Sequence, residues 1–147
     1  MNNKFLNAFV KETLRLYPPM APFVTRVAKS DYVYKGMTIP KGCGIFVGVY
    51  QVQTDPNLWS EPEKFDPTRF YEKYEQMAYQ VFGNGPRNCV GLRFSYMETN
   101  LILANLLRKY RILPGPSTEH GTIETKEFFS TRIPKNGVFC KLVPLSN

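Results

Sequence analysis

The sequence predicts an α+β fold, mainly α with small β-sheets, on three observations. Apolar residues recur at helical spacing over 3–17 and again over 89–110. Short runs of β-branched and aromatic residues, separated by glycine and proline turns, lie between these segments and after the second. The chain has 147 residues, of which 43% are hydrophobic, so 1–147 can form the core of a single domain.

The first predicted helix, 3–17, has the sequence NKFLNAFVKETLRLY. Proline disfavours helical backbone in the residue before it, so the pair Pro18-Pro19 ends the helix. Glu12 and Arg15 lie three residues apart and share a helix face. Taken alone, this spacing favours an exposed ion pair that contributes little to stability.

Strands are expected between 20 and 53, where glycine turns separate short apolar runs. Residues 44–52 are β-branched and aromatic, which predicts a buried strand. Residues 54–88 contain spaced prolines and predict a meandering coil with one short helix near 56–60.

The second predicted helix, 89–110, is stopped by the sequence P-G-P at 114–116, and 114–122 is expected to be a surface loop. The runs K-E-F-F-S-T-R-I and V-F-C-K-L-V lie on either side of P-K-N-G. This arrangement predicts a terminal β-hairpin with its turn at 134–137.

Composition excludes several classes of function. The net charge is +7, but the basic residues are scattered and do not suggest nucleic-acid binding. They indicate a solvated surface, or a surface that docks to an acidic protein or an anionic membrane. No run of 18 apolar residues predicts a membrane span, and the first residues do not resemble a signal peptide.

The three cysteines include no C-x-x-C pair, which argues against a disulfide framework or a zinc site. His120 is the only histidine, so a His-rich metal site or a Ser-His-Asp triad is not expected. Cys43 and Cys140 lie in apolar, strand-like runs and are predicted to be core residues.

Cys89 lies in the most informative segment, F-G-N-G-P-R-N-C-V-G at 82–91. Gly83 and Gly85 let the backbone turn tightly and approach a large flat ligand. The start of the following helix favours a thiolate, and Arg87 adds a positive charge that can pair with a carboxylate. The segment therefore indicates a metal-bound thiolate.

The same segment resembles the haem-binding loop of the cytochrome P450 family, which has cysteine-ligated haem. The family pattern falls on Phe82, Gly85, Arg87, Cys89 and Gly91 without a mismatch. The resemblance implies that the cofactor is haem b (iron protoporphyrin IX), with Cys89 as the axial iron ligand. It also implies that Gly83 and Pro86 contact the haem and that Arg87 binds a propionate.

Further segments resemble the family in the same order along the chain. E-T-L-R resembles its Glu-x-x-Arg helix, and F-D-P-T-R-F resembles the stretch that supplies a second arginine. The resemblance implies a buried structural network of Glu12, Arg15 and Arg69, although Thr68 replaces the family's usual glutamate. Gln53 stands where the family often has histidine, and we expect little to be lost there.

F-V-T-R-V-A at 23–28 resembles the family segment that lines the haem pocket, and its Arg26 corresponds to a propionate-binding arginine. By the same resemblance, the loops after the first helix and at the terminal hairpin face the substrate. The residues concerned are Pro22, Phe23, Val24, Phe129, Ser130 and Thr131.

The resemblance implies a monooxygenase that inserts one atom of O2 into an apolar organic substrate, with electrons from an NADPH-linked reductase. It further implies the cytosolic face of the endoplasmic reticulum membrane, with the anchor in a missing N-terminal part. Residues 4–143 resemble only the C-terminal, proximal haem side of a family member. We therefore expect Met1 to begin a truncated gene model or an incomplete fragment, without the distal proton-delivery residues.

Two alternatives stay open. One is a reductase-independent haem-thiolate isomerase or dehydratase, and the other is a non-catalytic remnant that binds haem poorly. Both predicted helices have apolar faces that partners outside 1–147 cover in the family, so we expect the isolated chain to aggregate and to hold haem weakly.

Overall fold

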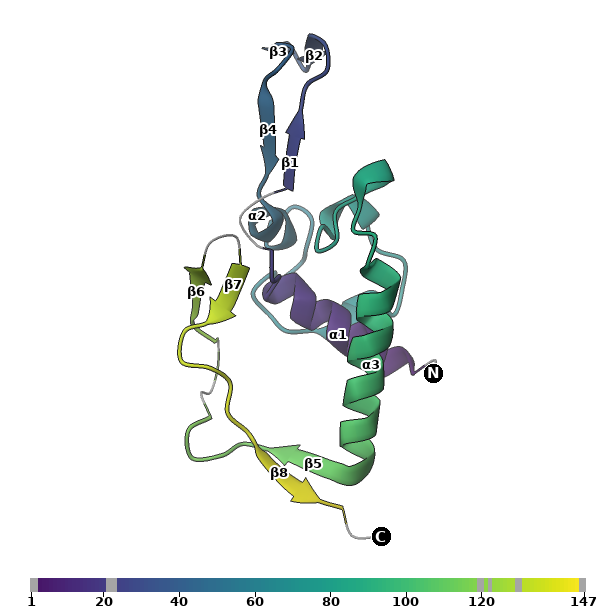
Figure 1. Ribbon diagram of the computed structural model, residues 1–147, viewed down its shortest axis with the longest axis vertical. Helices are drawn as coiled ribbons and strands as arrows, with labels where there is room; N and C mark the ends of the chain where they lie inside the picture. The colour runs from purple at the N-terminus through teal and green to yellow at the C-terminus, as the bar shows by residue number, and fades with distance from the viewer. Residues whose placement is uncertain (1–2, 21–23, 119–120, 122, 129–130, 146–147) are drawn as a thin grey trace.

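The computed structural model describes residues 3–20, 24–118, 121, 123–128 and 131–145, which form a mixed α+β structure (Figure 1). These residues contain three α-helices and four two-stranded antiparallel sheets, which is an α+β arrangement with small sheets. The α-helices are α1 (Lys4–Leu16), α2 (Val49–Gln53) and α3 (Leu92–Lys109). The 3-10 helices are η1 (Pro67–Phe70), η2 (Gln76–Ala78) and η3 (Gly85–Arg87).

Each sheet is a pair of short strands. β1 (Val24–Val27) pairs with β4 (Gly44–Val47), and β2 (Tyr32–Tyr34) pairs with β3 (Met37–Ile39). β5 (Tyr110–Leu113) pairs with β8 (Lys141–Pro144), and β6 (Thr125–Phe128) pairs with β7 (Thr131–Pro134). In Figure 1, β1–β4 form an arm that projects above α2, while β5 and β8 lie at the far end of α3.

The described core is small and lies against α1. Ala8 of α1 forms an apolar cluster with Trp59, Phe70 and Ala78, which the coil after α2 supplies. Asn3 starts α1 because its side-chain oxygen accepts the N–H of Leu6 at 3.0 Å. The helix therefore holds the long coil in place through its buried face.

The prediction of a buried strand over 44–52 is wrong in two respects. β4 ends at Val47, and Val49–Gln53 form α2 instead. The strand is also exposed: among the described strands it pairs with β1, and Phe46 is 63% accessible. Tertiary contacts override β-propensity here, because Val49 and Gln53 become buried.

The predicted terminal hairpin is also wrong in its pairing. β6 pairs with β7 across positions 129–130, and β8 pairs with β5, which precedes β6 by more than ten residues. The residues 134–137 therefore do not form a hairpin turn. Local turn residues could not reveal the long-range pairing of β5 with β8.

Other local predictions differ less from the structure. The helix expected over 89–110 runs from Leu92 to Lys109, and β5 follows it before the P-G-P sequence. Near 56–60 the backbone forms turns closed by Asp55, not a helix. Cys43 and Cys140 were expected in the core, but both are exposed.

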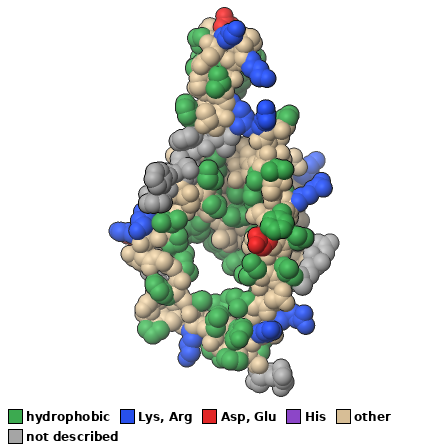
Figure 2. All heavy atoms as spheres, in the orientation of Figure 1, with side chains coloured by type: hydrophobic (Ala, Val, Ile, Leu, Met, Phe, Trp, Pro, Cys, Tyr) green, Lys and Arg blue, Asp and Glu red, His purple; other side chains and the backbone are tan. Residues whose placement is uncertain are grey.

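Hydrophobic side chains gather around an opening in the lower half of the molecule (Figure 2). A groove of about 610 Å³ lies between α1 and α3, and Phe5, Phe9, Leu103 and Leu107 line it. α3 itself has no buried residue. No helix in the described part of the chain is long and apolar enough to cross a membrane.

Candidate functional site

The loop before α3 is closed by its own backbone. Cys89 donates its N–H to the carbonyl of Phe82 at 2.8 Å, and Asn88 donates to Gly85 at 3.1 Å. Gly83 and Gly85 have φ angles of +68° and +79°, where a side chain would be strained. The glycines therefore allow a turn that places Cys89 just before α3.

The thiol of Cys89 is exposed at a hollow of about 320 Å³. Arg87 and Ser95 are the hydrophilic side chains of its described lining. The remaining wall is mostly apolar and comes from the end of α1, from α2 and from the loop itself: Leu14, Pro19, Met20, Val49, Val81 and Phe82. A soft sulfur ligand thus lies beside an apolar surface, which suits a large flat cofactor.

Arg26 of β1 approaches the same loop from the other side. Its guanidinium donates to the backbone carbonyl of Arg87 at 3.4 Å, and both arginines are exposed. Together with Lys29 they line a hollow of about 640 Å³ whose described lining has no carboxylate. This arrangement leaves two guanidinium groups available for anionic groups such as carboxylates.

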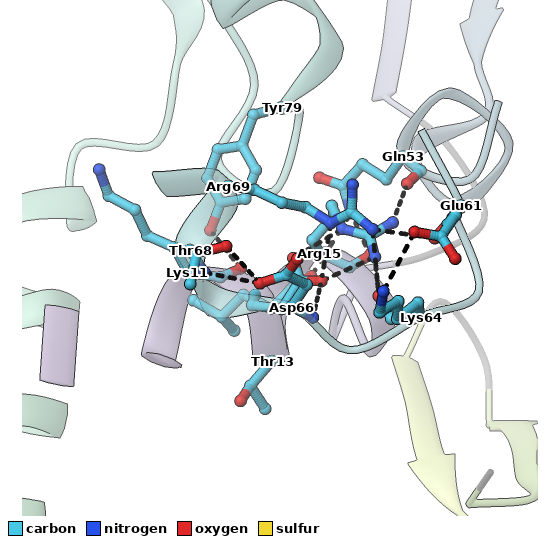
Figure 3. Close-up of polar contacts among 12 residues, drawn as sticks. Lys11, Thr13, Arg15, Gln53, Glu61, Lys64, Asp66, Thr68, Arg69 and Tyr79 are labelled. Carbon is cyan, nitrogen blue, oxygen red and sulfur yellow. Dashed lines mark hydrogen bonds and ion pairs between the residues drawn. The ribbon is translucent and has the colours of Figure 1, made fainter. Parts of the chain in front are cut away.

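Glu12 and Arg15 of α1 form a buried ion pair. Figure 3 shows Arg15 among its polar contacts. The guanidinium donates to both carboxylate oxygens, at 2.7 and 2.9 Å, and both side chains are 0% exposed. The pair is therefore buried, as the family resemblance implies, and is not the exposed surface contact that its spacing alone favours. Glu12 also accepts the N–H of Asp66 at 2.8 Å, which joins α1 to the coil.

Arg69 completes this arrangement from η1. Its Nε lies 3.3 Å from Glu12, and its other nitrogens donate to the backbone carbonyls of Ser60 and Glu61. The structure thus brings Glu12, Arg15 and Arg69 together across more than fifty residues of sequence. The planar guanidinium suits this task because it bridges a carboxylate and several carbonyls at once.

Thr68 replaces the glutamate of the family pattern and still has a local role. Its hydroxyl and its N–H both donate to the carboxylate of Asp66, which caps η1. These hydrogen bonds, with the charges of Arg69 and Lys64, hold the pKa of Asp66 below its ordinary value. The short helix that carries Arg69 therefore keeps an N-terminal cap.

Gln53, which stands where the family often has histidine, makes two buried links that the sequence did not indicate. It is 0% exposed, its Nε2 donates to the carbonyl of Arg15 at 2.8 Å, and its Oε1 accepts the N–H of Gln80 at 3.0 Å. Glutamine was expected to replace the family's histidine with little loss because it can still donate a hydrogen bond, and Gln53 does donate one. It also accepts the N–H of Gln80, so it links α1 to the segment leading into the cysteine loop.

Tyr79 and Tyr96 form a second unpredicted contact, with their hydroxyl oxygens 2.9 Å apart. Burial is the main cause that raises the pKa of both groups, that of Tyr96 to about 12. Tyr96 also stacks obliquely on Phe82, with ring centroids 5.2 Å apart. The helical spacing placed Tyr96 on an apolar face but did not indicate this hydrogen bond.

The substrate-facing positions are mostly beyond what the structure describes. Pro22, Phe23, Phe129 and Ser130 lie outside the described residues. Among the others, Val24 lies in β1 opposite Val47, and Thr131 lies in β7 opposite Phe128.

The residues present fit a haem. Cys89 offers one thiol to a metal, Arg26 and Arg87 offer cations for two carboxylates, and the wall between them is largely apolar. At Gly85 an added Cβ would meet no atom within 4 Å, so this side of the loop is open to a ligand. An exposed cysteine on a glycine turn, beside an apolar wall and two arginines, fits the class of haem-thiolate proteins.

Comparison with known proteins gives the family. The sequence model of the family described as "Cytochrome P450" matches residues 1–140. The chain belongs to the cytochrome P450 family.

Similar curated proteins include members named as cytochromes P450, and they are much longer than this chain. "Probable cytochrome P450 4s3" of Drosophila melanogaster is 43% identical over 113 residues, which are 75% of this chain and 23% of that protein. "Cytochrome P450 3A29" of Sus scrofa is 37% identical over 145 residues, 96% of this chain and 28% of that protein. "Thromboxane-A synthase" of Sus scrofa is 39% identical over 145 residues, which are 95% of this chain and 26% of that protein. The chain thus spans about a quarter of the length of these relatives.

Proposed function

We propose that this chain supplies the proximal, haem-binding side of a haem-thiolate monooxygenase, as a partial cytochrome P450 domain over 1–147. The observation that carries the proposal is the exposed thiol of Cys89, held on a closed loop between an apolar hollow and two arginines. Family membership supports the same assignment.

In this proposal the Cys89 thiolate would hold the haem iron, and the apolar ring of Phe82 would lie beside the sulfur. Arg26 and Arg87 would bind the two propionates. Gly83, Gly85 and Gly91 add no side-chain bulk to the loop that would contact the cofactor. Pro86 would contact the cofactor through its ring. When bound, haem supplies the activation of O2 and the insertion of one oxygen atom into an apolar substrate.

The buried network has a structural role in this proposal. Glu12, Arg15 and Arg69 fix the coil against α1, and Gln53 connects that helix to the residues that lead into the loop. None of these side chains lines the hollow at Cys89. They keep the thiol in place but take no part in the chemistry.

We also propose partners. A reductase linked to NADPH supplies electrons, and the basic residues Arg87 and Arg93, both exposed, present a positive surface to an acidic partner. By family resemblance the full-length protein lies at the cytosolic face of the endoplasmic reticulum membrane. Charge reversal at Arg93 is expected to slow electron transfer more strongly at low than at high salt.

A reductase-independent reaction is the second candidate, since one relative has a synthase name and is 39% identical. The requirement for a reductase separates the two. Turnover of a peroxide-like lipid without any electron donor supports the isomerase or dehydratase, whereas turnover only with the reductase supports the monooxygenase.

Titration of the purified chain with ferric haem tests the proposal. Three variants are compared with the unmodified chain: Cys89→Ala, and the controls Cys43→Ala and Cys140→Ala at the other two exposed cysteines. We expect thiolate-ligated haem in the unmodified chain and both controls and its loss in Cys89→Ala alone. Equal spectra in all four proteins would contradict Cys89 as the ligand, and no binding at all supports the non-catalytic remnant.

A further inference from the structure

We propose that the hydroxyl pair of Tyr79 and Tyr96 is a positioning device that holds the Cys89 loop between α1 and α3. The inference rests on the proposed function, because it names residues that support the same haem site. Neither tyrosine lines the hollow at Cys89, so both act through Phe82.

The first step is the direction of the hydrogen bonds. A phenol has a single hydrogen, and Tyr79 donates its hydrogen to the backbone carbonyl of Lys11 at 3.3 Å. Tyr96 must then be the donor in the contact of 2.9 Å between the two hydroxyls. The bonds therefore run in one direction, from α3 through the segment before the loop to α1.

The second step leads from Tyr96 to the cysteine. The ring of Tyr96 lies 5.2 Å from that of Phe82 and is inclined to it by 58°. The carbonyl of Phe82 accepts the N–H of Cys89 at 2.8 Å, so the residue whose ring contacts Tyr96 also fixes the backbone of Cys89. A shift of Tyr96 is thereby passed to the thiol through one side chain and one hydrogen bond.

The third step is the anchor on α1. Lys11 precedes Glu12 of the buried network, and Gln80, next to Tyr79, donates its N–H to Gln53. Two consecutive residues before the loop are thus bound to the part of the molecule that Glu12 and Arg15 hold together. The tyrosine pair connects α1, through Lys11 and Tyr79, to Tyr96 of α3.

The pair also stays uncharged. Burial raises the pKa of Tyr79, and it raises that of Tyr96 to about 12. Both hydroxyls therefore keep their hydrogens at neutral pH, and the contact does not depend on ionic strength as a surface ion pair does.

Amide hydrogen exchange of the chain without haem tests the proposal, with Cys89 N–H as the probe. Tyr96→Phe and Tyr79→Phe each remove one hydroxyl, and Tyr32→Phe on exposed β2 is the matched control. We expect exchange at Cys89 to become about fivefold faster in the first two variants, the effect of one lost net hydrogen bond. The N–H of Gly42, bonded to Ala28 in a distant turn, is expected to keep its rate.

Three outcomes would overturn the proposal. Cys89 N–H could be unprotected in the unmodified chain, its rate could be the same in all variants, or Gly42 could accelerate as much as Cys89. The last result would mean general destabilisation and not positioning.

A spectroscopic readout tests the consequence for the site. In the reduced, carbon monoxide-bound form we expect Tyr96→Phe to lower the thiolate-ligated share relative to the unmodified chain. Val10→Ala, a destabilising change in the buried face of α1, is expected to leave that share unchanged. An equal loss in Val10→Ala would contradict positioning. If Cys89→Ala itself alters nothing, the proposed function fails, while the exchange experiment still decides the role of the tyrosines.

Discussion

Arg15 and Gln53 exchange hydrogen bonds between side chain and backbone. The Arg15 guanidinium donates to the carbonyl of Gln53 at 2.7 Å, and the Gln53 amide donates to the carbonyl of Arg15 at 2.8 Å. Both side chains are 0% exposed, so water cannot replace either bond. This reciprocal contact joins the end of α1 to the end of α2 and makes Gln53 part of the network behind the cysteine loop.

Replacement of Gln53 by leucine is expected to lower the free energy of unfolding by about 3 kcal/mol, because it leaves the Gln80 N–H and the Arg15 carbonyl without partners. Urea denaturation measures the change. The control Gln51→Leu alters an exposed glutamine of the same helix. Equal stability of the two variants would show that the buried amide contributes nothing.

Replacement of Glu12 by alanine is expected to cost about 3–5 kcal/mol, since the Arg15 charge then stays buried without its carboxylate. The exposed pair of Glu61 and Lys64 provides the comparison, and Glu61→Ala is expected to change the free energy of unfolding by less than about 1 kcal/mol. Loss of the cooperative urea transition in Glu12→Ala agrees with the expectation. A cost as small as that of Glu61→Ala would contradict it.

Alkaline pH is expected to destabilise the chain through Tyr79 and Tyr96. Their pKa values are raised in the folded state, so above the ordinary value of 10.0 the unfolded chain loses protons that the folded chain keeps. Stability is therefore complete below pH 10 and falls as the pH rises towards about 12, the pKa of Tyr96. Denaturation at a series of pH values measures the slope, which Tyr96→Phe should reduce and Tyr32→Phe should not.

The apolar face of α3 is expected to make the isolated chain associate. Phe94, Met97 and Leu101 follow helical spacing on this face and are at least half exposed. The pair Met97→Glu with Leu101→Lys should lower the apparent mass in sedimentation at equal concentration. Ser30→Glu with Asn57→Lys adds the same two opposite charges elsewhere and should have no such effect. An equal response would mean that added surface charges, and not loss of the apolar face of α3, lower the apparent mass.

The sequence predicted those parts of the fold that depend on local periodicity. Both long helices followed from apolar spacing, and Pro18 marked the end of the first. The prediction of 44–52 as one strand failed because α2 forms through the burial of Val49 and Gln53, which local propensity does not contain. The prediction of a terminal hairpin failed for a similar reason. β8 pairs with β5, and a strand contact between segments far apart in the sequence leaves no local turn signal.

In the candidate site, too, motifs predicted some residues, whereas contacts that depend on packing could not be predicted. The positions of Glu12, Arg15, Arg69 and Cys89 could be named from motifs, because each motif fixes a residue type at a fixed spacing. The contact between Tyr79 and Tyr96 lacks such a pattern, since it depends on how α3 packs over the loop. The exposure of Cys43 and Cys140 likewise depends on packing that a strand-like sequence does not reveal.

The absorption spectrum of the reduced, carbon monoxide-bound chain tests the central claim most directly. Haem is added to the unmodified chain, to Cys89→Ala, and to Cys43→Ala as the control at another exposed cysteine. The account predicts the strongly red-shifted Soret band of a thiolate-ligated haem in the unmodified chain and the control, and its absence in Cys89→Ala. The same band in Cys89→Ala, or a haem-loaded chain that never shows it, would contradict the assignment of Cys89 as the iron ligand.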